Sequence, residues 1–209
     1  MNTPMAHTTE IAALFKSLRL SNPANYNVYL VGSRLWGTNT AGSDWDLLVV
    51  GDLSPGQLTS LHKSHYDVKL LDRDEFRARV KEGSIIEVVC ALVRKEDMLQ
   101  CAFDVGDVEV TLDAITTWLE ARQRKDMEKA EKFWLKGHRQ SGWKILRHMV
   151  HARILYNYLA PALREDRATL TIDDVQACIR AATWLCDKTW MQLDWKEAHV
   201  AVADVLASL

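Results

Sequence analysis

The chain of 209 residues has little cysteine, and its four cysteines form no Cys-x-x-Cys pair. This spacing excludes the common zinc-binding motifs, so we expect free, mostly buried thiols in a reducing compartment. The sequence also lacks an apolar run long enough to span a membrane, and its first residues are polar, unlike a signal peptide. We therefore expect a cytoplasmic protein without a membrane partner.

A Gly-x-x-x-x-Gly-Lys-Ser/Thr sequence is absent as well, which excludes a P-loop. Internal repeats and low-complexity tracts are also missing. Hydrophobic residues make up 48% of the chain and charged residues 26%, as in ordinary soluble proteins. A chain of this length can bury a core of its own, in one large domain or two small ones.

Polar residues that could bind a metal ion or take part in a reaction lie at the ends of apolar segments. The segment Val28–Val31 runs into Gly32 and Ser33, and after ten further residues Asp44 and Asp46 open a second apolar segment. Because side chains alternate along a strand, Asp44 and Asp46 are expected on the same face. Two carboxylates that close repel each other, and a divalent cation would relieve that repulsion.

A third carboxylate, Asp67, lies in another strand-like segment between Tyr66 and Val68. If its strand is next to that of Asp44 and Asp46, three carboxylates converge. Oxygen ligands of this kind suit Mg²⁺. Such a site can hold two metal ions roughly 3.5–4 Å apart. The sequence therefore predicts two Mg²⁺ ions bound by these three carboxylates, with Mn²⁺ as the alternative ion.

Two other residues compete with Asp67 for the role of third carboxylate. Glu87 lies in the apolar run Ile85–Val89, and Glu109 lies between two valines. Asp67 is preferred because it comes first after a turn and has strand-like neighbours. The choice among the three stays open at the level of sequence.

The Gly32-Ser33 pair has the properties of a phosphate-binding turn. Glycine allows a tight turn after a strand, and residues 33–37 can begin a short helix whose free N–H groups would face an anion. The Ser33 hydroxyl can donate to a phosphate oxygen, and the neighbouring Arg34 can neutralise charge. From the distant half of the chain, Lys144 is the best candidate for a further phosphate contact.

These residues resemble the DNA polymerase β-type nucleotidyltransferase superfamily. The matching motifs are Val31-Gly32-Ser33, Asp44-Trp45-Asp46-Leu47 and Tyr66-Asp67-Val68. The resemblance covers about residues 26–71, roughly a fifth of the chain. It looks closest to the bacterial and phage predicted nucleotidyltransferases, one branch of which is linked to RNA repair.

The resemblance implies an enzyme of the EC 2.7.7 type. It would transfer a nucleoside monophosphate from an NTP to an acceptor hydroxyl, with Mg²⁺, and release pyrophosphate. The acceptor is not identified. The alternative is a non-catalytic nucleotide-binding module or an antitoxin-like protein-interaction module, and a third hypothesis is an NTP-sensing regulator. The complete set of carboxylates argues against the binding-only alternative.

The order of expected elements indicates an α+β protein: a small mixed nucleotidyltransferase sheet flanked by helices, followed by an α-helical C-terminal domain. The expected domains are residues 1–110 and 111–209. Strands are expected at about 26–31, 44–50 and 65–71. Helices are expected at about 8–20, 56–63 and 72–82. The run 84–93 fits either a helix or a buried strand, and 108–112 fits a short strand.

Beyond residue 111 the pattern predicts long helices. The first reaches about Lys136, the second runs from Gln140 to about Leu159 and is stopped by Pro161, and the third starts at Thr171 and carries Trp184, Trp190 and Trp195. A short last helix is expected at 197–206. The oligomeric state cannot be predicted from the sequence.

Charge is unevenly distributed. Between Ala121 and Arg153 there are ten Lys and Arg against three Asp and Glu, so this segment carries +7 and the remainder about −9 of the net −2. A basic segment opposite an acidic metal site suits a polyanionic substrate and modestly favours an RNA end as acceptor. His148 and His151 are candidates for acid/base groups, but ordinary hydrogen-bonded helix residues are the preferred expectation.

Two tryptophans flank the motif. Trp45 is expected in the core. Trp36 follows the phosphate turn, and it is expected either to stack on a base or to pack against the helical tail.

Overall fold

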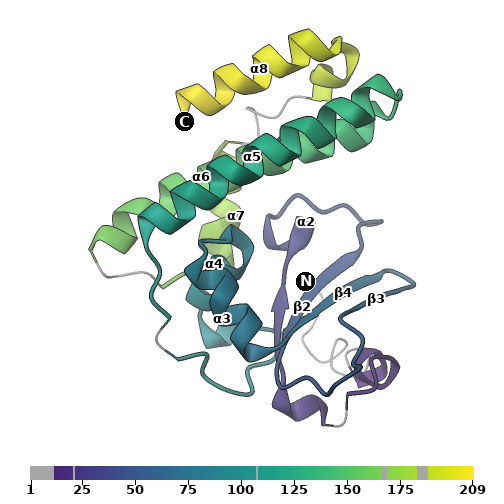
Figure 1. Ribbon diagram of the computed structural model, residues 1–209, viewed down its shortest axis with the longest axis vertical. Coiled ribbons are helices and arrows are strands. Elements are labelled where there is room, and N and C mark those ends of the chain that lie inside the picture. Colours follow the sequence, from purple (N-terminus) through teal and green to yellow (C-terminus); the bar gives the residue numbers. More distant parts are fainter. Residues whose placement is uncertain (1–11, 21, 107, 166–168, 183–187) are drawn as a thin grey trace.

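The computed structural model describes residues 12–20, 22–106, 108–165, 169–182 and 188–209. It consists of a head, built on a mixed four-stranded sheet, and a tail of long helices that lies across one end of the head (Figure 1). The α+β class is confirmed. In the described part of the chain, none of the helices is both long enough and apolar enough to cross a membrane.

The sheet has the strand order β1-β2-β4-β3. The strands are β1 (Asn27–Leu30), β2 (Trp45–Val50), β3 (Ser60–Lys63) and β4 (Tyr66–Leu71). The central strands β2 and β4 are parallel, and the two outer pairings are antiparallel. The three strands expected from the sequence are therefore confirmed.

Each face of the sheet covers its own apolar core. On one face, Val28, Leu47 and Val68 pack against Leu14 and Phe15 of the N-terminal segment, in which residues 12–17 are helical. On the other face, the alternate residues of the strands belong to the large core shared with the later helices. They include Tyr29, Leu48, Val50 and Leu71. The expected start of the first helix, at residues 8–11, lies outside the described residues.

In its described residues the head also contains the helices α2 (Gly32–Leu35), α3 (Arg73–Lys81) and α4 (Ile85–Leu92) and the short 3-10 helices η1 (Pro23–Asn25) and η2 (Lys95–Asp97). The Asp72 carboxylate caps α3 by accepting a hydrogen bond from the Glu75 N–H, and Gly83, with a φ of +80°, ends this helix. The run 84–93, which fitted both a helix and a strand, is helical.

Two expectations for the head were wrong. Residues 56–63 do not form a helix: they contain a turn, and Ser60–Lys63 form the edge strand β3 against β4. Residues 108–111 do not form a strand, because Thr111 is the N-cap of the first tail helix and accepts a hydrogen bond from the Ala114 N–H. In both places hydrogen bonding to a neighbouring element decides the conformation.

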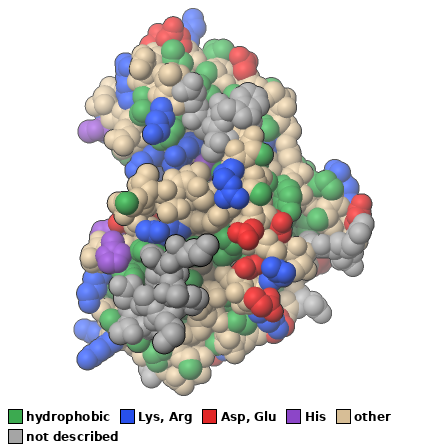
Figure 2. Space-filling model, turned by 180° about the vertical axis from the view of Figure 1, so that it is seen from behind, with side chains coloured by type: hydrophobic (Ala, Val, Ile, Leu, Met, Phe, Trp, Pro, Cys, Tyr) green, Lys and Arg blue, Asp and Glu red, His purple; other side chains and the backbone are tan. Residues whose placement is uncertain are grey.

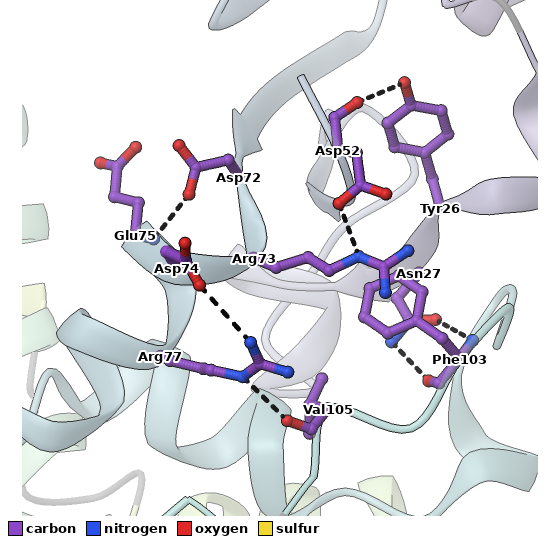
Figure 3. A network of polar contacts seen from close by, with 10 residues as sticks. All are labelled: Tyr26, Asn27, Asp52, Asp72, Arg73, Asp74, Glu75, Arg77, Phe103 and Val105. Atoms are coloured by element: carbon purple, nitrogen blue, oxygen red, sulfur yellow. Dashed lines mark hydrogen bonds and ion pairs between the residues drawn. The ribbon is translucent and has the colours of Figure 1, made fainter. Parts of the chain in front are cut away.

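The segment that leads from the head to the tail is held by a polar network at the far end of the sheet (Figure 3). The Asn27 side chain accepts from the Phe103 N–H and donates to the Phe103 carbonyl. Arg73 lies 3.8 Å from the centre of the Phe103 ring and forms an ion pair with Asp52, while Arg77 donates to the Val105 carbonyl. These contacts fix where the chain leaves the head.

The tail contains α5 (Leu112–Leu135), α6 (Arg139–Arg164), α7 (Ile172–Ala181), the 3-10 helix η4 (Lys188–Gln192) and α8 (Trp195–Ser208). Helices α5 and α6 form a hairpin through Gly137, and α8 packs on the side of this hairpin away from the head (Figure 1). The first two tail helices are close to expectation.

Two details of the tail differ from the sequence prediction. Pro161 lies inside α6, which continues to Arg164, because the φ of proline is compatible with a helix and only one N–H donor is lost near the end. The third helix is shorter than expected: Trp190 lies in η4, and Trp195 begins α8. Trp184, expected in that helix, lies outside the described residues.

Candidate active site

The turn between β1 and α2 lies directly against β2. Gly32 has a φ of +63°, and a Cβ atom at this position would lie 1.8 Å from the Asp46 Oδ2 atom. The Val31 N–H donates to the Asp46 carbonyl at 2.9 Å. Both the positive φ and the close approach therefore require glycine here, and the turn is held against the second strand.

The parallel pairing of β2 with β4 sets Asp46 opposite Asp67. Residues paired in this way on adjacent strands have side chains on the same face of the sheet. This face is the one that also carries Leu48 and looks toward the tail. Asp44 immediately precedes β2, and it is exposed, like Asp67, whereas Asp46 is half-buried.

The electrostatic environment of Asp46 is unfavourable for its charge. Burial raises the pKa of Asp46 most, the Asp67 carboxylate raises it further, the Ser33 N–H lowers it, and Asp44 raises it again. A divalent cation with a preference for oxygen ligands would relieve this repulsion, so the donor chemistry fits such an ion. Among the residues that the structure describes, no three His, Cys, Asp or Glu side chains form a ready-made metal site.

Arg34 contacts the loop that follows α2. Its guanidinium group donates to the Ser43 carbonyl at 2.8 Å and to the Asp44 carbonyl at 3.2 Å, and it lies 4.0 Å from the centre of the Trp45 ring. Its observed contacts therefore brace the loop that carries Asp44. Trp45, expected in the core, is only half-buried.

A cleft of about 800 Å³ separates the head from the first half of α6. Its head wall contains Gly32, Ser33, Asp44 and Asp46, and its tail wall contains basic and aromatic residues together with two histidines, namely Trp143, Lys144, Arg147, His148, His151 and Lys188. An acidic wall thus faces a basic one. Lys144, singled out from the sequence, lines the cleft. Arg34 and Asp67 lie outside its lining.

His151 is a residue of this cleft that sequence reasoning misjudged. Its side chain is buried, with 1% exposed, and neither ring nitrogen has a hydrogen-bond partner in the described structure. Burial and then the nearby Arg147 lower the pKa of His151 to about 3, so the ring is neutral at pH 7. The expectation of a hydrogen-bonded histidine was therefore wrong.

A sequence signal for this helix face existed. Lys144, Arg147, His148 and His151 follow the spacing of three and four residues that places side chains on one face of a helix. The His151 ring lies 6.2 Å from that of Trp36, centre to centre. Trp36 is buried in the core shared with the tail. Of its two expected roles, stacking on a base and packing against the tail, the second is the one seen in the structure.

The two other candidates for the third carboxylate lie in different surroundings. Glu87 is buried on α4, where it accepts a hydrogen bond of 2.5 Å from the Ser84 hydroxyl and forms ion pairs with Lys69 at 3.2 Å and with Arg79 at 3.6 Å. Glu109 is exposed in the irregular segment before α5. Of these candidates, Asp67 is the one paired with Asp46 in the sheet.

Residues 11–110 match the family model described as nucleotidyltransferase domain. The head is thus similar to nucleotidyltransferase domains. The match supports the polymerase β-like superfamily, whose domains generally use an NTP and a divalent metal ion. It spans the Gly32-Ser33 turn and the strands that carry Asp46 and Asp67. No curated protein matches the chain.

Proposed function

We propose that the protein is an enzyme of the EC 2.7.7 type that transfers a nucleoside monophosphate from an NTP to an acceptor hydroxyl. The observation that carries this proposal is the pairing of Asp46 with Asp67 next to the Gly32-Ser33 turn, where Asp46 lines a cleft whose opposite wall is basic. An NTP needs both features, because its metal ions require carboxylates and its triphosphate requires cations.

The chain's own residues would divide the work as follows. Ser33 and the turn hold the phosphates from the head side, and Lys144 and Arg147 neutralise their charge from the tail side. Asp44, Asp46 and Asp67 would hold Mg²⁺, or Mn²⁺, which supplies charge neutralisation and makes a bound hydroxyl a better nucleophile. Positioning of the reactants and charge neutralisation account for most of the rate enhancement in such a transfer.

A transfer assay tests the proposal. The protein is incubated with each α-³²P-labelled NTP, Mg²⁺ and a cell extract, and both label transfer and pyrophosphate are measured. We expect transfer that is lost in Asp44→Asn and Asp46→Asn. Transfer that persists in these variants contradicts the proposal. Mg²⁺-dependent NTP binding without pyrophosphate in any condition would instead favour the binding-only or antitoxin-like alternative.

The third carboxylate is tested by a matched pair of variants. We expect Asp67→Asn to abolish transfer and Glu109→Gln to leave it unchanged, because only the former faces Asp46 in the sheet. Equal effects of the two substitutions would remove Asp67 from the proposed ligand set. The cytoplasmic location and the RNA-repair-linked branch stay predictions.

A further inference from the structure

A second cavity, of about 410 Å³, lies between the head and the tail. Its walls come from β2 and β4, from the start of α4, and from the facing sides of α5 and α6. It shares Gly32, Asp46 and His148 with the cleft of about 800 Å³ described above, which is called the nucleotide cleft from here on. Its volume falls within the usual range for sites that enclose a small molecule.

The position of this cavity relative to Asp46 is suited to an acceptor. In the proposed transfer, the attacking hydroxyl and the leaving pyrophosphate must lie on opposite sides of the α-phosphorus, in line. Because Asp46 lines both cavities, a nucleotide in the larger cleft and a second molecule in the smaller cavity would meet at this carboxylate. The two cavities can therefore separate the leaving group from the nucleophile.

The charges around the second cavity are balanced. Three cations, Lys69, Arg79 and Arg122, line it together with three carboxylates, Asp46, Glu87 and Asp126. Most are paired with one another: Lys69 with Glu87 at 3.2 Å, Arg79 with Glu87 at 3.6 Å, and Arg122 with Asp126 at 2.7 Å. A polyanion such as RNA is favoured by unpaired positive charge, and this cavity does not supply it.

The basic segment that favoured RNA in the sequence has another use in the fold. Lys144 and Arg147, which belong to it, line the nucleotide cleft, where a triphosphate needs counter-charge. On the face of the molecule shown in Figure 2, basic side chains of the described residues lie mainly on the left and across the middle, and acidic ones gather mainly on the right, below the middle. Two of the ten basic residues of this segment are therefore explained by the nucleotide without an RNA strand.

The remaining lining of the second cavity suits a compact molecule with rings and polar groups. Trp36, Trp118 and Met149 contribute apolar surface. The Gln123 Nε2 atom is buried and has no hydrogen-bond partner among the described residues, so an oxygen of a ligand can satisfy it. A mixture of apolar walls and a few polar groups is typical of small-molecule sites.

We propose that this cavity is the acceptor site and that the acceptor is a small, uncharged or zwitterionic hydroxyl compound of the size of a sugar, a nucleoside or an amino acid. This inference rests on the proposed nucleotidyl transfer. The acceptor oxygen forms a bond to the α-phosphorus, the bond from this phosphorus to the bridging oxygen breaks, and pyrophosphate leaves with that electron pair. The hydroxyl proton passes to a carboxylate of the site.

The acceptor class is tested with defined probes. The full-length protein is incubated with α-³²P-labelled NTPs and Mg²⁺ in three parallel reactions: with a panel of hexoses, nucleosides and hydroxyl amino acids, with total RNA, and with a mixture of proteins. We expect labelled product and pyrophosphate with the small-molecule panel alone. Label in RNA or protein, with pyrophosphate, overturns this inference and leaves the proposed function intact. Absence of pyrophosphate in every reaction overturns both.

A pair of substitutions on α6 tests the cavity itself. Ala152 lines it, and Ala152→Phe would fill part of its volume; Ala162 lies on the same helix and lines neither cavity. We expect Ala152→Phe to raise the KM for the acceptor about tenfold or more with the KM for NTP unchanged, and Ala162→Phe to change neither constant.

A second variant keeps the test decisive if Ala152→Phe fails to fold. Gln123→Leu removes the unpartnered amide of the cavity with little change in volume, and we expect it to raise the KM for the acceptor with unchanged NTP binding. An unchanged KM for the acceptor in a folded variant of either kind overturns the assignment of this cavity.

Discussion

On the head side of the nucleotide cleft, Gly32, Ser33, Asp44 and Asp46 come from fifteen consecutive positions of the chain. On the tail side, Lys144 and the residues that follow it on α6 come from about a hundred positions later. The head wall is acidic and packed too closely for any side chain at position 32, while the tail wall is basic and contains a neutral histidine. The head thus supplies a local motif, and the tail supplies counter-charge that exists only after folding.

The largest expected effect comes from a substitution in the head wall of the nucleotide cleft. Asp46→Asn removes the carboxylate that faces Asp67, and because a bound metal ion contributes several kcal/mol to such a transfer, we expect the rate to fall by roughly a hundredfold or more. The variant should retain the fold, and an assay of labelled product checks the rate. A retained rate would separate Asp46 from the chemistry.

The same substitution has an opposite effect on stability. The raised pKa of Asp46 means that the folded state disfavours its charge. The protonated, uncharged form of Asp46 is the form that the fold tolerates. Its contribution to stability is therefore fully present below the ordinary pKa of 3.8 and is lost as the pH rises through the raised pKa of the folded state. We therefore expect Asp46→Asn to increase Tm more at pH 7 than at pH 4, as measured by thermal unfolding.

A methyl group at the turn should act on both stability and activity. Gly32→Ala combines a φ of +63° with a clash against Asp46, so we expect a loss of about 1–3 kcal/mol in the free energy of unfolding and a strong loss of transfer. Gly56→Ala is the matched control, because Gly56 also has a positive φ, +78°, but its Cβ would meet open space. Urea unfolding should show a smaller loss there, with normal transfer.

The tail wall is tested by removal of one cation. Lys144→Ala should raise the KM for NTP by roughly tenfold, since a charged hydrogen bond contributes about 1.5–3 kcal/mol. Lys132→Ala is the control, because Lys132 is exposed on α5 and lines neither cavity. Equal KM values in the two variants would show that the basic wall does not contact the nucleotide.

The smallest expected effect concerns the neutral histidine. His151→Leu removes two buried ring nitrogens that have no hydrogen-bond partner among the described residues, so Tm should rise slightly. Because the pKa of His151 in the fold is about 3, its contribution to stability is lost as the pH falls from about 6.5 toward 3. The gain in Tm should therefore be larger at pH 5 than at pH 7.5, and an equal gain would contradict the buried, neutral state.

Much of the head could be predicted because its signals are local. Alternation of side chains along a strand predicted Asp44 and Asp46 on one face, and both line the same cleft although Asp44 precedes β2; a glycine after an apolar segment was enough to indicate the turn. The pairing of Asp46 with Asp67 is different, because it depends on how residues 51–65 cross from one strand to the other. The edge strand β3 was missed since its residues are mostly exposed and carry no periodic apolar pattern.

The tail side of the site could be predicted only in part. The spacing of Lys144, Arg147 and His151 on one face of α6 can be read from the sequence, but their shared cleft depends on how the tail packs on the head. The burial of His151 in particular depends on Trp36, which lies more than a hundred positions earlier in the chain. The burial of the Glu87 carboxylate similarly depends on ion-pair partners from other elements, Lys69 of β4 and Arg79 of α3.

Helix α6 forms part of the wall of both cavities, through Lys144 and Arg147 on the nucleotide side and through Met149 and Ala152 on the other. A ligand that shifts this helix on one side therefore changes the room available on the other. Any coupling between the affinities of the two sites would act through this one helix, and thermodynamic reciprocity would make its size equal in both directions.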